Sequence, residues 1–240
     1  MVVVLASLLA VQAAPAKTKN PPPGKVVDSG TFEIVVDGKR VGTETFNIQD
    51  HGATNVTSSL TKVLAGTTKA EQSATLEMSS AGELIHYDWK ELSPGKATST
   101  VEVSQNAVVQ HIVMNDAKKP VDLPYMTAPS TMVLDDNFFS HRQLLVWRYL
   151  RGSCGTGTDG KQSCTPAKLG VLIPAQHLVA VISLELVGNE KMNYKGAERD
   201  VTHLKLMADD VQWDIWTDPA DSYKILRIYI PSNKTEVVRN

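Results

Sequence analysis

From residue 31 to residue 115 the chain consists of strand-length segments that are separated by turns too short to hold a helix. The first pair of segments is the clearest. Phe32, Ile34 and Val36 occupy every second position, and an Asp-Gly dipeptide at 37–38 then supplies the two residues of a tight hairpin turn before segment 40–48. Because gaps of this length cannot hold a crossover connection, consecutive segments are predicted to pair as antiparallel neighbours.

The same pattern returns at residue 168, with turn signals rich in Gly, Ser, Asn and Pro between the segments. A total near twelve strands is too many for a flat sheet, so the sheet should curl. We therefore predict a mainly β fold, a single strongly bent antiparallel sheet or half-barrel, with one amphipathic helix packed on it. The further strands are predicted at 54–64, 68–78, 84–92, 98–104, 108–115, 168–173, 178–187, 198–207, 211–217, 224–230 and 235–239.

Residues 136–151 break this pattern and have the apolar spacing of a helix. Asp135-Asp136 offers a cap for its start, and Gly152 ends it. A fold with one helix and many strands has only the sheet to cover the apolar stripe, so the stripe is predicted to be buried against the sheet. Its members are Phe138, Phe139, Leu145, Val146, Tyr149 and Leu150.

The beginning of the chain indicates export. Residues 2–11 have the length of the apolar region of a secretory signal peptide, and Val11-Gln12-Ala13 offers small residues at the cleavage positions. Residues 1–13 are therefore predicted to be a signal peptide, although no Lys or Arg precedes the apolar run. A Pro/Lys-rich spacer follows at 14–25, and 26–240 is predicted to be a single β domain. The apolar run is shorter than the roughly 18 residues that span a bilayer, so we expect a periplasmic or extracellular protein without a transmembrane anchor in its mature chain.

The two cysteines agree with export. Cys154 and Cys164 are ten positions apart in a glycine-rich loop. In an oxidising compartment they should form a structural disulfide. The alternatives are a redox pair, which normally has a C-x-x-C spacing, and half of a metal site, which would need further His or Cys ligands nearby.

Neither the charge nor the motifs indicate an enzyme or a nucleic-acid-binding protein. The formal net charge is −2 and the basic residues are scattered, which predicts no nucleic-acid partner. There is no G-x-S-x-G motif and no close pair of histidines, so we predict no catalytic residues, no metal ligands and no cofactor. A site that strands assemble from distant residues stays open. The acidic pairs Asp135-Asp136 and Asp209-Asp210 are interpreted as a helix cap and a turn.

Aromatic residues are the candidates for a ligand cavity. Trp89 shares its phase with Ile85 and Tyr87, and Trp213 alternates with Val211 and Ile215. A Trp in such a stripe is usually part of the core, but aromatic side chains also line the clefts that bind apolar ligands. The ligand-binding candidates are Trp89 and Trp213 on strands, and Phe138 and Tyr149 in the helical segment.

Several short motifs resemble a family of exported bacterial β-rich proteins of unknown function, whose domains are similar to the periplasmic lipoprotein-carrier half-barrels. The motifs are Gly30-Thr31-Phe32-Glu33-Ile34-Val35-Val36-Asp37-Gly38-Lys39-Arg40-Val41-Gly42, Asp136-Asn137, Ile173-Pro174, and Trp216-Thr217-Asp218 with Leu226-Arg227-Ile228. The resemblance covers most of the predicted domain. It implies a bent antiparallel sheet whose concave apolar face is covered by a helix or loop, and in some members this face carries acyl chains.

Three functions remain open at this point. The leading hypothesis is binding of an apolar small molecule or lipid between the sheet and the helix, without catalysis. The second is a structural or interaction protein of the cell envelope, with a protein partner that the sequence does not identify and a concave face filled by its own core. The third is a hydrolase with a dispersed site. An apolar cavity of roughly 300–1,000 Å³ would favour the first, and convergent His and carboxylate side chains would favour the third.

Overall fold

The computed structural model describes residues 24–240 except 66–67, 105–106, 116–118, 129 and 157–161. The predicted signal peptide and the spacer up to residue 23 lie outside the described residues. In the described part the chain is mainly β, with a single α-helix and one large sheet that does not close on itself. The predicted fold class is therefore confirmed at this level.

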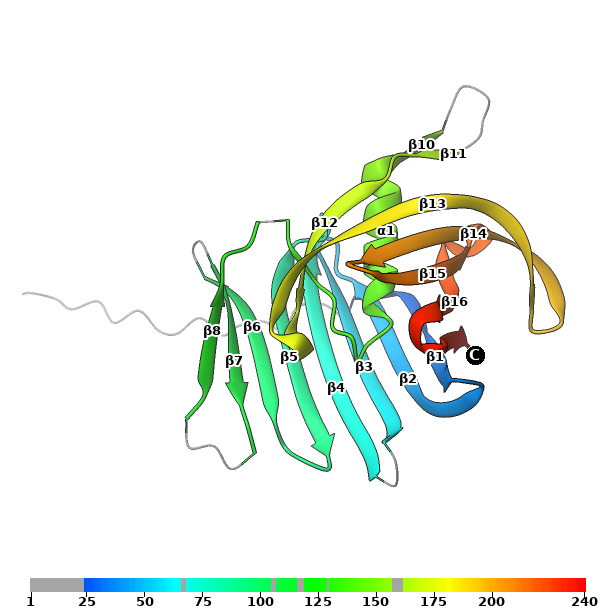
Figure 1. Cartoon of the computed structure of the whole chain (residues 1–240). Coiled ribbons are helices and arrows are strands. Elements are labelled where there is room, and N and C mark those ends of the chain that lie inside the picture. Colours follow the sequence, from blue (N-terminus) through cyan, green and yellow to red (C-terminus); the bar gives the residue numbers. More distant parts are fainter. Residues whose placement is uncertain (1–23, 66–67, 105–106, 116–118, 129, 157–161) are drawn as a thin grey trace, which may run out of the picture.

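The first half of the sheet is the antiparallel meander that the turn signals predict (Figure 1). Each strand pairs with the next along the chain. Asp37 and Gly38 both have positive φ angles, 48° and 75°, as the predicted tight turn requires. The strands are β1 (Lys25–Val36), β2 (Lys39–Asp50), β3 (Thr54–Ala65), β4 (Thr68–Ser79), β5 (Leu84–Ser93), β6 (Thr98–Ser104), β7 (Ala107–Val113) and β8 (Val121–Tyr125).

The second half is another meander, and the last strand joins it to the first half. β17 pairs with β1 in register from Phe32 opposite Arg239 to Val36 opposite Thr235. A short strand before the helix, β9 (Met132–Val133), runs parallel to β12 and forms one edge of the sheet, while β8 forms the other. The strands of this half are β12 (Ala167–Ile173), β13 (Leu178–Tyr194), β14 (Ala197–Ala208), β15 (Val211–Asp218), β16 (Lys224–Ile230) and β17 (Thr235–Arg239).

Within the described residues the sheet has fifteen strands, so the predicted total of about twelve is wrong. The additional strands in the sheet, β8 and β9, lack a clear alternating pattern. β8 contains Pro124, which cannot donate a ladder hydrogen bond and is tolerated because this strand lies at an edge. A separate two-stranded hairpin, β10 (Cys154–Thr156) and β11 (Gln162–Cys164), follows the helix. The disulfide between Cys154 and Cys164 joins its two strands, as predicted.

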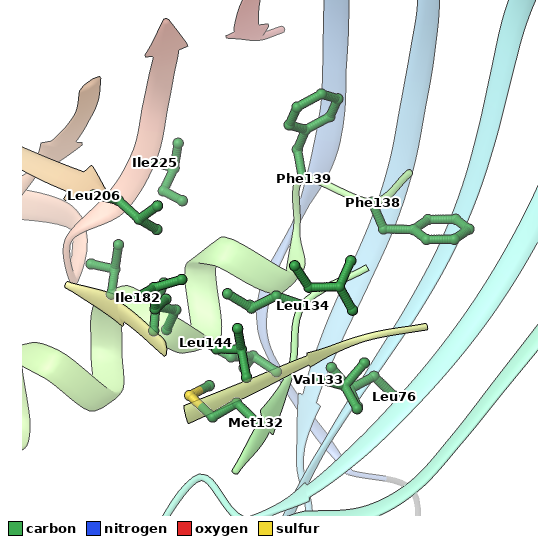
Figure 2. Close-up of a cluster of buried hydrophobic side chains, with 14 of the residues drawn as sticks. Leu76, Met132, Val133, Leu134, Phe138, Phe139, Leu144, Ile182, Leu206 and Ile225 are labelled. Carbon is green, nitrogen blue, oxygen red and sulfur yellow. The ribbon is translucent and has the colours of Figure 1, made fainter. Parts of the chain in front are cut away.

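Between the helix and the meander lies the main hydrophobic core. β12 and β13 cross over α1 (His141–Ser153), so the helix has sheet on more than one side (Figure 1). Figure 2 shows Met132, Val133 and Leu134 between the helix and Leu76 of β4. The predicted stripe members Phe138, Phe139, Leu145 and Tyr149 are all buried, which confirms the expectation that the sheet covers them.

The helix itself begins later than predicted. It starts at His141, with Phe138 and Phe139 in the turn before it. The predicted cap is wrong because the Asp135 carboxylate is used inside this turn, where its Oδ1 accepts the N–H of Asn137 at 2.8 Å. The first half of the helix is also buried on all sides, including the polar residues His141, Arg142 and Gln143. It is therefore less amphipathic than the sequence pattern predicts.

Candidate functional site

A buried carboxylate from the sheet fixes the start of α1. Glu44 of β2 is fully buried, and its oxygens accept the N–H of Phe139 at 2.6 Å and of Ser140 at 3.2 Å. The Ser140 hydroxyl lies 2.8 Å from that of Ser59 on β3. Burial raises the pKa of Glu44, and these hydrogen bonds partly oppose the rise. The helix is thus anchored at its first residues to two neighbouring strands.

One turn further along, two helix side chains hold a strained turn of the second meander. Gln143 donates from Nε2 to the carbonyl of Tyr223 at 3.0 Å and accepts the N–H of Ile225 at 2.7 Å. Trp147 donates from Nε1 to the carbonyl of Ser222 at 2.7 Å. Ser222 and Tyr223 both have φ of 55°, which is costly for residues with a side chain. The bonds from the helix stabilise this conformation and so fix the position of the Tyr223 ring.

These contacts form a groove of about 360 Å³ between the helix, β3, β4 and the turn before β16, which we call the helix groove. Its volume is within the range of small-molecule sites. Trp147 and Tyr223 contribute aromatic surface, Leu144 and Met78 are buried beside them, and Arg151 is exposed. The complete lining is Asn55, Met78, Ser79, Gly82, Leu144, Trp147, Leu150, Arg151, Ser222 and Tyr223.

Basic side chains lie along the open side of the helix. Arg148 donates from Nη1 to the carbonyls of Gly82 at 2.9 Å and Ser130 at 2.8 Å, and burial lowers its pKa. On the other side of Arg148, a wide depression of about 620 Å³ is lined by Arg148, Arg151 and Lys168 among others. Positive charge therefore lies next to the apolar lining of the helix groove.

The structure places the four predicted ligand-binding residues in different environments. Trp89 lines a separate cavity on β4–β7. Trp213 lies 4.6 Å beneath the guanidinium of Arg142, with the Phe139 ring 6.2 Å away. These contacts make Trp213 part of the packing around the start of the helix.

The two helix-segment candidates belong to the core. Phe138 is fully buried and stacks on the His141 ring with 5.6 Å between centroids. Tyr149 accepts the N–H of Leu186 at 3.0 Å on its hydroxyl, and it also borders the basic depression. Of the three cavities described here, the helix groove contains none of the four candidates, and the other two contain one each, Trp89 and Tyr149.

Sequence reasoning did not single out Trp147 or Tyr223. Trp147 lies one turn after Leu144 and one turn before Arg151 on the same helix. This spacing predicts that the three residues share one side of the helix. Tyr223 carries no such signal, because its position depends on the strained turn and on bonds from a helix about eighty residues earlier in the chain.

The buried His141 is a poor candidate for acid–base chemistry. Its Nδ1 accepts the N–H of Asp135 at 3.3 Å, and its Nε2 has no hydrogen-bond partner among the described residues. Burial, together with the nearby Arg142 charge, lowers its pKa to about 3. Within the described residues, no three His, Cys, Asp or Glu side chains gather as metal ligands.

Comparisons with known proteins identified no relative of this chain. No protein-family model, no curated protein sequence and no solved structure matches the chain. In the part of the chain that is described, no helix combines the length and the apolar character needed to cross a membrane. The function must therefore be inferred from the side chains and cavities of this chain alone.

Proposed function

We propose that this chain is an exported, non-enzymatic binding protein whose curved sheet is a half-barrel of the carrier type. Its ligand is an amphiphile with an apolar chain and an anionic group, and it binds in the helix groove. The observation that carries the proposal is the groove itself, about 360 Å³ between sheet and helix, with Trp147 and Tyr223 held by hydrogen bonds.

The lining supports this class of ligand. Met78, Leu144 and the ring of Trp147 offer the apolar contact that an acyl chain needs. Arg151 on the exposed side can meet a carboxylate or phosphate without being buried. The disulfide between Cys154 and Cys164 supports an oxidising compartment, which is the basis for proposing export to the periplasm or the extracellular space.

The test uses dodecanoate as the probe and delipidated full-length protein. We expect saturable binding in calorimetry with a negative ΔCp, because apolar surface is buried. Replacing Trp147 by Leu should weaken binding by about tenfold, because an aromatic side chain at the centre of a site commonly carries that much affinity.

Trp216→Leu is the matched control. Trp216 lies in a smaller cluster with Tyr194 and Leu226 and does not line the helix groove, so its loss should leave dodecanoate binding unchanged. If neither dodecanoate nor phospholipid vesicles show saturable uptake, the carrier proposal is wrong.

A structural or interaction protein is the second candidate, and one observation favours it. The space between the sheet and the helix is filled by a continuous core that includes Phe32, Leu76, Leu145, Leu184 and Ile228. A ligand is therefore limited to the margin of this core. Under this alternative the protein would bind no amphiphile, and its partner would be another protein.

A further inference from the structure

A second cavity lies away from the helix groove, between β4–β7 and the turn that precedes β13. Its volume is about 290 Å³. Trp89, Gln72 and Ser99 line it from the strands, Asp135 lines it from the turn before the helix, and His177 closes it from the turn after η1 (Pro174–Gln176). Ala97, Ile112 and Met114 add apolar surface.

One side chain, Gln110 of β7, holds the closing turn in place. It donates from Nε2 to the Ser99 hydroxyl at 2.9 Å and to the carbonyl of Pro174 at 3.1 Å. Its Oε1 accepts the Tyr125 hydroxyl at 2.9 Å and lies 3.2 Å from Nδ1 of His177. Both ends of this buried amide are therefore engaged by the protein, and the cavity has a fixed wall.

The charge of the lining is negative. Glu91 and Asp135 are its carboxylates, and none of its described lining residues is Lys or Arg. Asp135 is 2% exposed, and its carboxylate accepts the Tyr87 hydroxyl at 2.6 Å and the N–H of Asn137 at 2.8 Å, neither of which is charged. Burial accordingly raises the pKa of Asp135. A buried carboxylate that is hydrogen-bonded but not ion-paired gains from a cation placed beside it.

The guanidinium nearest to Asp135 is used elsewhere. Arg142 donates to the main-chain carbonyls of Asp135 and Phe138, and it forms an ion pair with Asp136 at 3.0 Å. Asp135 therefore lines the cavity without a direct ion pair between its carboxylate and Arg142, whose charge acts on the carboxylate only from a longer distance.

The aromatic residue of the cavity also favours a positively charged ligand. Trp89 is held by a 3.0 Å hydrogen bond from its Nε1 to Oε1 of Gln72. Indole faces attract organic cations, and the apolar residues Ala97, Ile112 and Met114 can contact the methyl groups of a quaternary ammonium.

We propose that this cavity is a binding site for a small organic cation, held by Trp89, Glu91 and Asp135. The proposal is independent of the helix groove, because the two cavities share no lining residue.

The experiment compares choline with its neutral isostere 3,3-dimethyl-1-butanol by calorimetry on the full chain. Choline should bind saturably and the isostere at least about tenfold more weakly, because only the charge differs. Glu91→Gln should weaken choline binding by about tenfold and leave binding of the isostere unchanged. Trp89→Leu should weaken choline binding as well.

Glu77→Gln is the matched control, because Glu77 lies on β4 but does not line the cavity. This variant should bind choline like the wild type. Asp135→Asn tests the buried carboxylate directly. If the Asp135→Asn protein does not fold, Glu91→Gln still tests the proposal. Equal affinity for choline and the isostere, no saturable choline binding, or equal losses in Glu91→Gln and Glu77→Gln would overturn the proposal.

Discussion

The two ends of α1 are held by different chemistry. At its start, polar groups are buried on all sides, and Glu44, Ser59 and Asp135 bind the backbone or side chains of the first turn. At its end, Trp147 and Leu150 are only half buried, Arg151 is exposed, and the chain continues into the disulfide hairpin. The first, closed end lies away from the helix groove and borders only the cavity that Asp135 and Trp89 line, whereas the second, open end borders the helix groove. Stability should therefore depend mainly on the first end, and binding in the helix groove on the second.

The largest effect is expected from Glu44→Ala. This change leaves the buried N–H groups of Phe139 and Ser140 without an acceptor, so the free energy of unfolding should fall by about 3–5 kcal/mol. Glu44→Gln keeps an oxygen acceptor and removes a charge that burial disfavours, so it should cost clearly less. Urea unfolding of both variants measures the difference. Equal losses would mean that the charge, not the acceptor, holds this end.

Core truncation at the closed end should come next. Leu145 is fully buried, and Leu145→Ala should lower the free energy of unfolding by roughly 2–5 kcal/mol. Leu150→Ala makes the same substitution on the same helix at a half-buried position of the open end, and it should cost about 1 kcal/mol or less. A shift of the urea midpoint that is the same for both variants would show that the two ends contribute alike.

Loss of the disulfide should have a smaller effect. Cys154 and Cys164 close a loop at the open end, and the chain-entropy model assigns such a loop roughly 2–3 kcal/mol. The Cys154→Ser, Cys164→Ser double variant should therefore remain folded with a lower thermal midpoint, because the main core does not depend on the hairpin. Loss of the far-ultraviolet β spectrum at 25 °C would contradict this expectation.

The change in stability expected over a single pH unit is smaller than the loss expected without the disulfide, and it concerns His141 at the closed end. His141 takes up a proton near pH 6.5 when unfolded but only near pH 3 when folded. Its contribution to stability is therefore complete above pH 6.5 and is lost as the pH falls toward 3, by up to about 1.4 kcal/mol per pH unit. Comparing wild type with His141→Gln by urea unfolding at pH 6, 5 and 4 isolates this loss, since other groups titrate alike in both proteins. Parallel pH profiles would exclude His141 as their cause.

The sequence pattern predicted the features of the fold that depend on residues close together in the chain. The hairpin at Asp37-Gly38, the meander order and the disulfide all depend on residues close in sequence, and the structure confirms each of them. An irregularity in β5 shows the limit of such patterns. Leu84 and Tyr87 are both buried and Ile85 between them is exposed, because the register with β4 shifts between the pairs Met78–Leu84 and Glu77–His86. Regular alternation does not reveal this shift.

The start of α1 and the two cavities depend on contacts between residues far apart in the chain, which the sequence pattern did not predict. The acceptor at the start of α1 comes from Glu44, about ninety-five residues earlier in the chain, so no local cap signal could identify it. The helix groove and the second cavity each combine residues from distant segments, such as Asn55 with Tyr223 and Trp89 with His177. Trp89 was the only predicted ligand-binding residue to line either of these two cavities.

The pairing of β17 with β1 also limits the order in which the chain can fold. Phe32 pairs with Arg239, so the strand that joins the two meanders is synthesised after the other strands of the described sheet. Bringing β1 and β17 together costs conformational entropy before their contacts form, because a long segment of chain separates them. This cost slows folding. One side of β1 therefore stays unpaired until β17 has been synthesised. Synthesis from the N-terminus cannot complete this sheet strand by strand.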